Sequence, residues 1–118
     1  MRARDHFRAH ARRKVNLLAG LHRLAYDGRS GEAVRIRDLG LGGACVELGD
    51  RAAPLRLDSA VTLEVTAPTL WDPLVLRGRV AWVRPGRDDH PTKAGVRFEH
   101  TEQSGIFALF QLLTAHSF

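Results

Sequence analysis

The fold of this chain is decided by residues 33–48, which are Ala33-Val34-Arg35-Ile36-Arg37-Asp38-Leu39-Gly40-Leu41-Gly42-Gly43-Ala44-Cys45-Val46-Glu47-Leu48. Apolar side chains alternate with charged or polar ones over 33–37 and again over 44–48, which is the period of a half-buried β-strand. Three glycines lie between these two segments and favour a turn. No helical pattern follows the glycines, so they do not form a dinucleotide-binding fingerprint. The stretch predicts two strands joined by a glycine-rich turn.

Further strands are predicted on both sides of this stretch. Residues 60–66 form the clearest one, because they are β-branched, alternating and closed by Pro68. Residues 74–83 and 93–99 alternate in the same way, with Arg84-Pro85-Gly86 as a turn signal between them. The apolar pattern over 15–26 fits a strand or a helix. Several short strands separated by turns are typical of an all-β protein, either an antiparallel barrel or a sandwich.

The C-terminal segment has a different period and predicts an α-helix over about 100–116. Thr101 is a suitable N-cap, and acidic and amide side chains follow it in the first turn. The apolar residues then recur at i, i+3, i+4 and i+7, at Ile106, Leu109, Phe110 and Leu113. We expect this helix to plug or flank the sheet with its apolar face.

Length and composition favour one soluble domain. The chain has 118 residues, of which 44% are hydrophobic and 26% charged. It contains no apolar stretch of the roughly 18 residues that a membrane span needs, and no apolar segment follows its basic N-terminus as in a secretory signal. The single cysteine, Cys45, excludes an internal disulfide and is expected to be a packing residue. We therefore expect a cytoplasmic protein without membrane insertion.

The positive charge is concentrated at the N-terminus. The chain carries a formal charge of +5, and residues 1–14 account for all of it with six basic side chains and Asp5. Residues 15–118 hold equal numbers of basic and acidic side chains. We expect residues 1–14 to form a flexible basic arm and 15–118 to form the folded domain. Such an arm fits an anionic partner, or else serves only as a solubilising tail.

The arm and the glycine-rich turn together suggest a site for a guanine nucleotide. Arg8 and Arg12 can grip phosphate through two parallel hydrogen bonds or stack on a purine. The carboxylate of Asp38 can accept hydrogen bonds from the N–H groups of a guanine edge, and the glycines let the backbone approach a ligand. Without the arginines, Asp38 is more often a turn former than a ligand contact.

In the spacing of these residues the chain resembles the PilZ domain, a bacterial receptor module for cyclic di-GMP. That family is marked by an R-x-x-x-R arm followed, some 20 to 30 residues later, by a [D/N]-x-S-x-x-G turn between two barrel strands. Here Arg8 and Arg12 match the arm, and after 25 intervening residues Asp38, Gly40 and Gly43 match the turn. The resemblance continues through Gly78–Val83, Gly95–Phe98 and an apolar C-terminal helix. It implies a six-stranded antiparallel β-barrel with a C-terminal helix.

The resemblance implies a role for each matching residue. Arg8 and Arg12 would contact the phosphates and guanines of cyclic di-GMP, with Arg13 as a spare cation, and Asp38 would accept from a guanine. Gly40 and Gly43 would permit the tight turn and close backbone contact. The arm would fold over the ligand, and its ordering would be passed to a partner protein in trans. The chain would thus be a signalling receptor or adaptor, and not an enzyme.

The chain departs from the family pattern at Gly40, which replaces the serine. The loss of one hydrogen bond of that kind costs about 1 kcal/mol, or roughly five-fold in affinity. One alternative is therefore a degenerate adaptor that binds only protein. A second is a nucleic-acid-binding barrel with a basic arm, which the equal numbers of basic and acidic side chains in residues 15–118 disfavour. His6 and His10 have a spacing of four, but neighbouring arginines disfavour a metal. Trp82 is expected in the core, although a tryptophan on the barrel surface could stack on a base.

Overall fold

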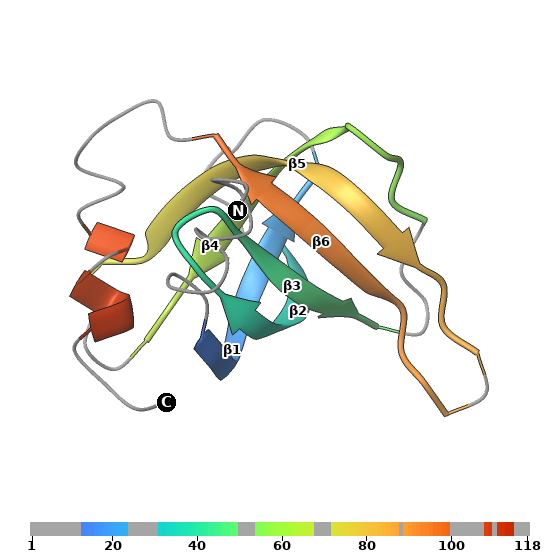
Figure 1. The fold of residues 1–118 in the computed structure, drawn as a ribbon, viewed down its shortest axis with the longest axis horizontal. Helices are drawn as coiled ribbons and strands as arrows, with labels where there is room; N and C mark the ends of the chain where they lie inside the picture. Colours follow the sequence, from blue (N-terminus) through green and yellow to red (C-terminus); the bar gives the residue numbers. More distant parts are fainter. Residues whose placement is uncertain are drawn as a thin grey trace, which may run out of the picture.

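Six antiparallel strands form a closed barrel (Figure 1). The structure is a computed structural model that describes residues 13–23, 31–49, 54–67, 72–87, 89–99, 108–109 and 111–114. The strands are β1 (Arg13–His22), β2 (Glu32–Leu39), β3 (Gly43–Leu48), β4 (Ala60–Val65), β5 (Leu74–Arg84) and β6 (Lys93–Phe98). The all-β, six-stranded antiparallel barrel is therefore confirmed. The ambiguous segment 15–26 is a strand as far as His22, and its residues 24–26 lie outside the described residues. Because β1 begins at Arg13, the last two residues assigned to the arm belong to the barrel.

The barrel consists of two three-stranded meanders joined along two seams. Strands β1, β2 and β3 pair in succession, and so do β4, β5 and β6. The two meanders meet where β1 pairs with β4 and where β3 pairs with β6. The order around the barrel is thus β1-β2-β3-β6-β5-β4, and strands far apart in sequence become neighbours.

The interior is filled by the apolar half of each alternating pattern. In β3, for example, Ala44, Val46 and Leu48 are buried while the residues between them are partly exposed. The side chains of Ile36, Leu39, Val46, Leu63 and Val65 are 0% exposed. The strand period that the sequence predicts therefore places the core correctly.

One end of the core is completed by C-terminal helical residues. Residues 108–109 and 111–114 are helical, and Leu109, Leu112 and Leu113 are buried in the same apolar cluster as the strands. Their i, i+3, i+4 spacing places them on one face of a helix. The predicted helix and its packing against the barrel are confirmed in this part. Ile106, Phe110 and the predicted helix ends lie outside the described residues.

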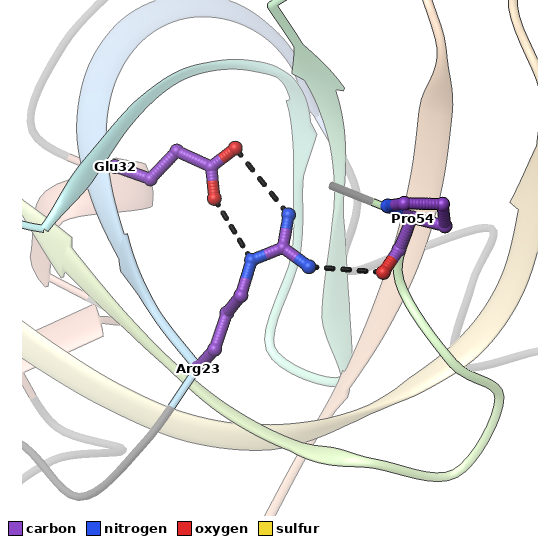
Figure 2. A network of polar contacts seen from close by, with 3 residues as sticks. All are labelled: Arg23, Glu32 and Pro54. Atoms are coloured by element: carbon purple, nitrogen blue, oxygen red, sulfur yellow. Dashed lines mark hydrogen bonds and ion pairs between the residues drawn. The ribbon is translucent and has the colours of Figure 1, made fainter. Parts of the chain in front are cut away.

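A polar network ties the end of β1 to β2 and to the segment before β4 (Figure 2). Arg23 donates to both carboxylate oxygens of Glu32, from Nε at 2.9 Å and from Nη2 at 3.4 Å. Its Nη1 donates to the carbonyl oxygen of Pro54 at 3.0 Å. A two-pronged arginine–carboxylate contact fixes geometry better than a single bond. The chain is therefore held at Pro54 just before it enters a turn and then β4.

Candidate functional site

The three turn residues predicted for the site come together at the β2–β3 hairpin. Asp38 lies near the end of β2, opposite Cys45 of β3, and its side chain is partly exposed. The N–H of Gly40 donates to the carbonyl oxygen of Gly43 at 2.9 Å, which closes the hairpin around Leu41 and Gly42. The N–H of Phe98 in β6 donates to the carbonyl oxygen of Gly42 at 2.9 Å. The turn is thus held by the barrel itself, with no contribution from a side chain at position 40.

Gly43 is required by the packing of β3 against β6. A Cβ atom at this position would lie 2.3 Å from the carbonyl oxygen of Val96, well inside van der Waals contact. Gly43 pairs with Arg97, so the crowding comes from the backbone of the neighbouring strand. The motif glycine therefore has a structural role in the barrel, whatever its contact with a ligand.

A row of four outward-facing positions leads from Asp38 across the barrel. Asp38 of β2 pairs with Cys45 of β3, Cys45 with Gly95 of β6, and Gly95 with Trp82 of β5. We refer to these four residues as the Asp38–Trp82 row. Adjacent strands are about 4.8 Å apart, so the row spans about 14 Å along the curved sheet. It joins a carboxylate at one end to an aromatic ring at the other.

Trp82 lies on the surface, and the expectation that it belongs to the core is wrong. The register of β5 against β6 shifts between Val80 and Trp82, and this irregularity reverses the alternation. Val80 is buried, whereas Trp82 is 38% exposed. The indole covers Gly95, where a Cβ atom would lie 2.1 Å from its Nε1 atom. Arg84 lies over the same ring, with its guanidinium carbon 5.9 Å from the centroid.

Basic side chains border the Asp38–Trp82 row on one side. The next positions along the same four strands are Arg35, Glu47, Lys93 and Arg84. Arg37, at the irregularity in β2, lies 3.5 Å from Oε1 of Glu47, and Nζ of Lys93 lies 3.9 Å from the same oxygen. One carboxylate therefore faces several cations. The net charge of residues 15–118 is zero, so it does not reveal this local excess of positive charge.

Two arginines border the row on its other side. Arg97 of β6 pairs with Gly43 on one flank and with Arg79 of β5 on the other. Nε of Arg79 lies 3.2 Å from Oε1 of Glu99, and Nη2 of Arg97 lies 3.9 Å from Oδ1 of Asp58. Arg97 is 64% exposed, so solvent weakens its pair with Asp58. The sequence does not predict the basic residues on either side of the row, because they come close together only through the order of the strands in the barrel.

Of the three arginines predicted for the site, only Arg13 lies among the described residues. Arg8 and Arg12 lie outside the described residues. Arg13 is opposite Leu39 at the start of β1, and its Nη1 donates to the carbonyl oxygen of Leu113 in the C-terminal helical segment. Its guanidinium is thus engaged by the protein in this structure. Lys14 lies directly opposite Asp38 and is exposed.

Within the described ranges, no group of three His, Cys, Asp or Glu side chains could hold a metal ion. His6 and His10 lie outside those ranges. Of the same described residues, none belongs to a helix that is long and apolar enough to cross a membrane.

Solved structures share this fold at low sequence identity. The PilZ domain of YcgR from Escherichia coli, solved with c-di-GMP, matches with a TM-score of 0.68 and 18% identity, over 88% of this chain and 86% of that one. The PilZ domain of CeSA from a cellulose-synthesising bacterium matches with a TM-score of 0.65 and 17% identity, over 88% and 95%. MotI/DgrA of Bacillus subtilis, an inhibitor of motility, matches with a TM-score of 0.64 and 13% identity, over 86% of this chain.

The chain spans about half of the MotI/DgrA chain, 47% of its length. No curated protein sequence matches the chain. The family model of the PilZ domain matches residues 3–115, which include both the arm and the barrel. Together with the closed six-stranded barrel, this match identifies the chain as a member of the PilZ domain family.

Proposed function

We propose that this protein binds cyclic di-GMP along the Asp38–Trp82 row and passes the ordering of its arm to a partner protein. On this proposal it is a cytoplasmic receptor or adaptor without catalytic activity. The observation that carries the proposal is the row itself, which joins a guanine acceptor to an aromatic platform. The YcgR PilZ domain, which has a similar fold, was solved with this ligand.

The chemistry of the row matches that of a cyclic dinucleotide. Cyclic di-GMP carries two guanines on a ring that contains two anionic phosphates. Asp38 can accept from the N–H groups of one guanine. A base can stack on the partly exposed indole of Trp82 if it takes the place that Arg84 has over the ring in this structure. The small side chain of Cys45 leaves the floor of the row low beside Asp38, whereas the Trp82 indole covers Gly95. The bordering cations and the arm, with Arg8 and Arg12, supply positive charge for the phosphates.

Calorimetric titration of the purified protein with cyclic di-GMP tests this proposal. We expect binding that Arg8→Ala and Arg12→Ala each abolish, while Arg4→Ala, a matched arginine of the arm outside the motif, changes it little. Asp38→Asn should weaken binding about ten-fold or more, since hydrogen bonds to a charged group contribute about 1.5–3 kcal/mol. The absence of heat at high-micromolar ligand with the folded wild-type protein would overturn the proposal.

Trp82 provides a second, optical test. The chain has two tryptophans, Trp71 and Trp82, so a Trp71→Phe background isolates the signal from the row. Stacking of a base should quench the Trp82 fluorescence in proportion to the calorimetric occupancy. Quenching that is absent at full occupancy would exclude Trp82 from the site.

A degenerate adaptor is the second candidate, and Gly40 favours it. The hairpin closes through the backbone of Gly40 and Gly43, so the turn persists without the hydroxyl that the family pattern supplies. The Gly40→Ser variant separates the two candidates. A weakened receptor should gain about five-fold in affinity. A degenerate adaptor should bind its partner equally well with either residue and without nucleotide.

A further inference from the structure

An exposed leucine lies at the tip of a tight turn beside the candidate site. The turn runs from Arg56 to Ser59, immediately before β4, and the segment passes alongside β5 in Figure 1. Leu57 is 67% exposed, the highest value among the exposed large hydrophobic residues of the described chain. Leu55, two residues earlier, is buried in the core. The chain thus inserts one leucine into the barrel and presents the next to solvent.

The turn is rigid. The N–H of Ser59 and its hydroxyl both donate to the carbonyl oxygen of Arg56, at 3.3 and 2.6 Å. The N–H of Asp58 donates to the carbonyl oxygen of Val80 in β5 at 2.7 Å, and the N–H of Val80 donates to that of Ser59 at 3.0 Å. Upstream, Arg23 holds the carbonyl oxygen of Pro54. The backbone at Leu57 is therefore fixed by hydrogen bonds before any partner arrives, which lowers the entropic cost of docking.

The backbone of the turn is strained in a way that glycine would avoid. Asp58 has a φ of 62°, and it is the one non-glycine residue with positive φ in the described part of the chain. A turn with positive φ only at its third residue is of type II and favours glycine there. Asp58 tolerates this conformation, and its carboxylate lies 3.9 Å from Nη2 of Arg97. Strain of this kind is often retained where a surface has a function.

Three arginines lie on the Leu57 turn or contact it at Asp58. Arg56 precedes it and is exposed, and no polar contact of its guanidinium is found within the described residues. Nη1 of Arg79 donates to the carbonyl oxygen of Asp58 at 2.9 Å, and Arg97 is 64% exposed beside Asp58. We call Arg56, Leu57, Arg79 and Arg97 the Leu57 surface. Arg79 and Arg97 also face the carboxylates of Glu99 and Asp58, so the three arginines still outnumber the two acidic side chains beside the leucine. Such a surface is complementary to an apolar pocket with a rim of carboxylates.

We propose that the Leu57 surface docks a partner protein through an apolar pocket with an acidic rim, which receives Leu57. The inference rests on the proposed function for the existence of a protein partner. It also explains how a partner could sense the ligand, since Arg97 lies next to both Gly43 and the Leu57 turn. A ligand on the Asp38–Trp82 row would therefore bind directly beside the docked partner.

Site-directed photo-crosslinking in the cells that make this protein tests the proposal. The photoreactive residue p-benzoylphenylalanine replaces Leu57 or, as a matched control, Leu18, which is 61% exposed on β1. We expect an adduct with one protein from position 57 and none from position 18. An adduct from both positions, from neither, or between two copies of this chain would overturn the proposal.

Calorimetry with that protein in purified form completes the test. Leu57→Ala should weaken binding at least ten-fold, Arg97→Glu should do the same, and Leu18→Ala should change the affinity less than two-fold. Equal affinities for the Leu57→Ala and wild-type proteins would overturn the proposal. Leu57→Ala should keep its affinity for cyclic di-GMP, so failure of the docking surface can be distinguished from failure of the nucleotide site.

Discussion

Two glycines that face β-strand neighbours should respond very differently to the same substitution. A Cβ atom at Gly43 would lie 2.3 Å from the carbonyl oxygen of Val96, whereas one at Gly95 would lie 2.1 Å from the indole of Trp82. Neither glycine has a φ in the left-handed region, so the comparison isolates steric contact. In Gly43→Ala the obstacle is backbone, and β3 must move away from β6. In Gly95→Ala the obstacle is a half-exposed side chain that can rotate.

The expected losses of stability in the two variants follow from whether the added methyl group meets backbone or a side chain. Overpacking against a fixed neighbour costs about 1–3 kcal/mol, and at Gly43 the overlap of about 1 Å with a carbonyl places the cost at the upper end. Replacing glycine by alanine also stabilises the protein by about 0.4–1 kcal/mol, because it lowers the conformational entropy of the unfolded chain. We expect Gly43→Ala to lower the free energy of unfolding by about 2 kcal/mol and the Tm by roughly 8 °C. Gly95→Ala should change the free energy by less than about 1 kcal/mol.

Urea unfolding, followed by circular dichroism, measures both values, with unchanged m-values as the check for two-state behaviour. The fluorescence of Trp82 in the Trp71→Phe background should shift in Gly95→Ala and stay unchanged in folded Gly43→Ala. Equal losses of stability in the two variants would refute the reasoning, because the chemical change is identical and only the obstacle differs. A stable Gly43→Ala protein would show that the strands are less closely packed than the structure indicates.

Three further substitutions test the supporting contacts, each by urea unfolding. Arg13→Ala removes the bond to the carbonyl oxygen of Leu113 and should cost about 1 kcal/mol; an unchanged midpoint would show that this contact does not form in solution. Glu32→Gln leaves Arg23 without its carboxylate and should cost about 1 kcal/mol, less at high salt, and a loss independent of salt would contradict an ionic contribution. Leu109→Ala empties a fully buried position and should cost about 3 kcal/mol, whereas Leu18→Ala should cost almost nothing; similar losses would mean that the helix does not pack as described.

The sequence predicts the strands well where alternation is regular. The segments 33–37 and 44–48 lie within β2 and β3, and the burial of Val34, Ile36 and Val46 follows the expected faces. In β1 the burial alternates from Val15 to Leu18, but the sequence does not show it, because the exposed Leu18 is as apolar as the buried Leu17 and two adjacent leucines suit either period. Alternation fails at Trp82, since a one-residue irregularity is invisible in the pattern yet reverses the face.

The candidate site is predictable only in part for a different reason. Asp38, Gly40 and Gly43 are close in sequence, so a motif identifies them together. Trp82 and Gly95 lie 44 and 57 residues beyond Asp38 and reach it only because β3 pairs with β6. The Leu57 turn has no sequence motif, and the features that distinguish it, an exposed leucine next to an aspartate with positive φ, are visible only in the structure. Pairing across a barrel and backbone conformation are properties of the folded chain.

The seam between β3 and β6 also determines when this site can exist during synthesis. The first three strands can pair as soon as they emerge from the ribosome, because hairpin contacts are local. The Asp38–Trp82 row crosses the seam, so it needs β6, whose last residue is Phe98, and the helical residues that cover the core follow still later. Pairing β6 with β3 closes the long stretch of chain between them, which has a larger entropic cost than forming a hairpin. On the proposed function, a nascent chain that carries the whole aspartate–glycine motif would therefore remain unable to bind cyclic di-GMP until β6 has also been made.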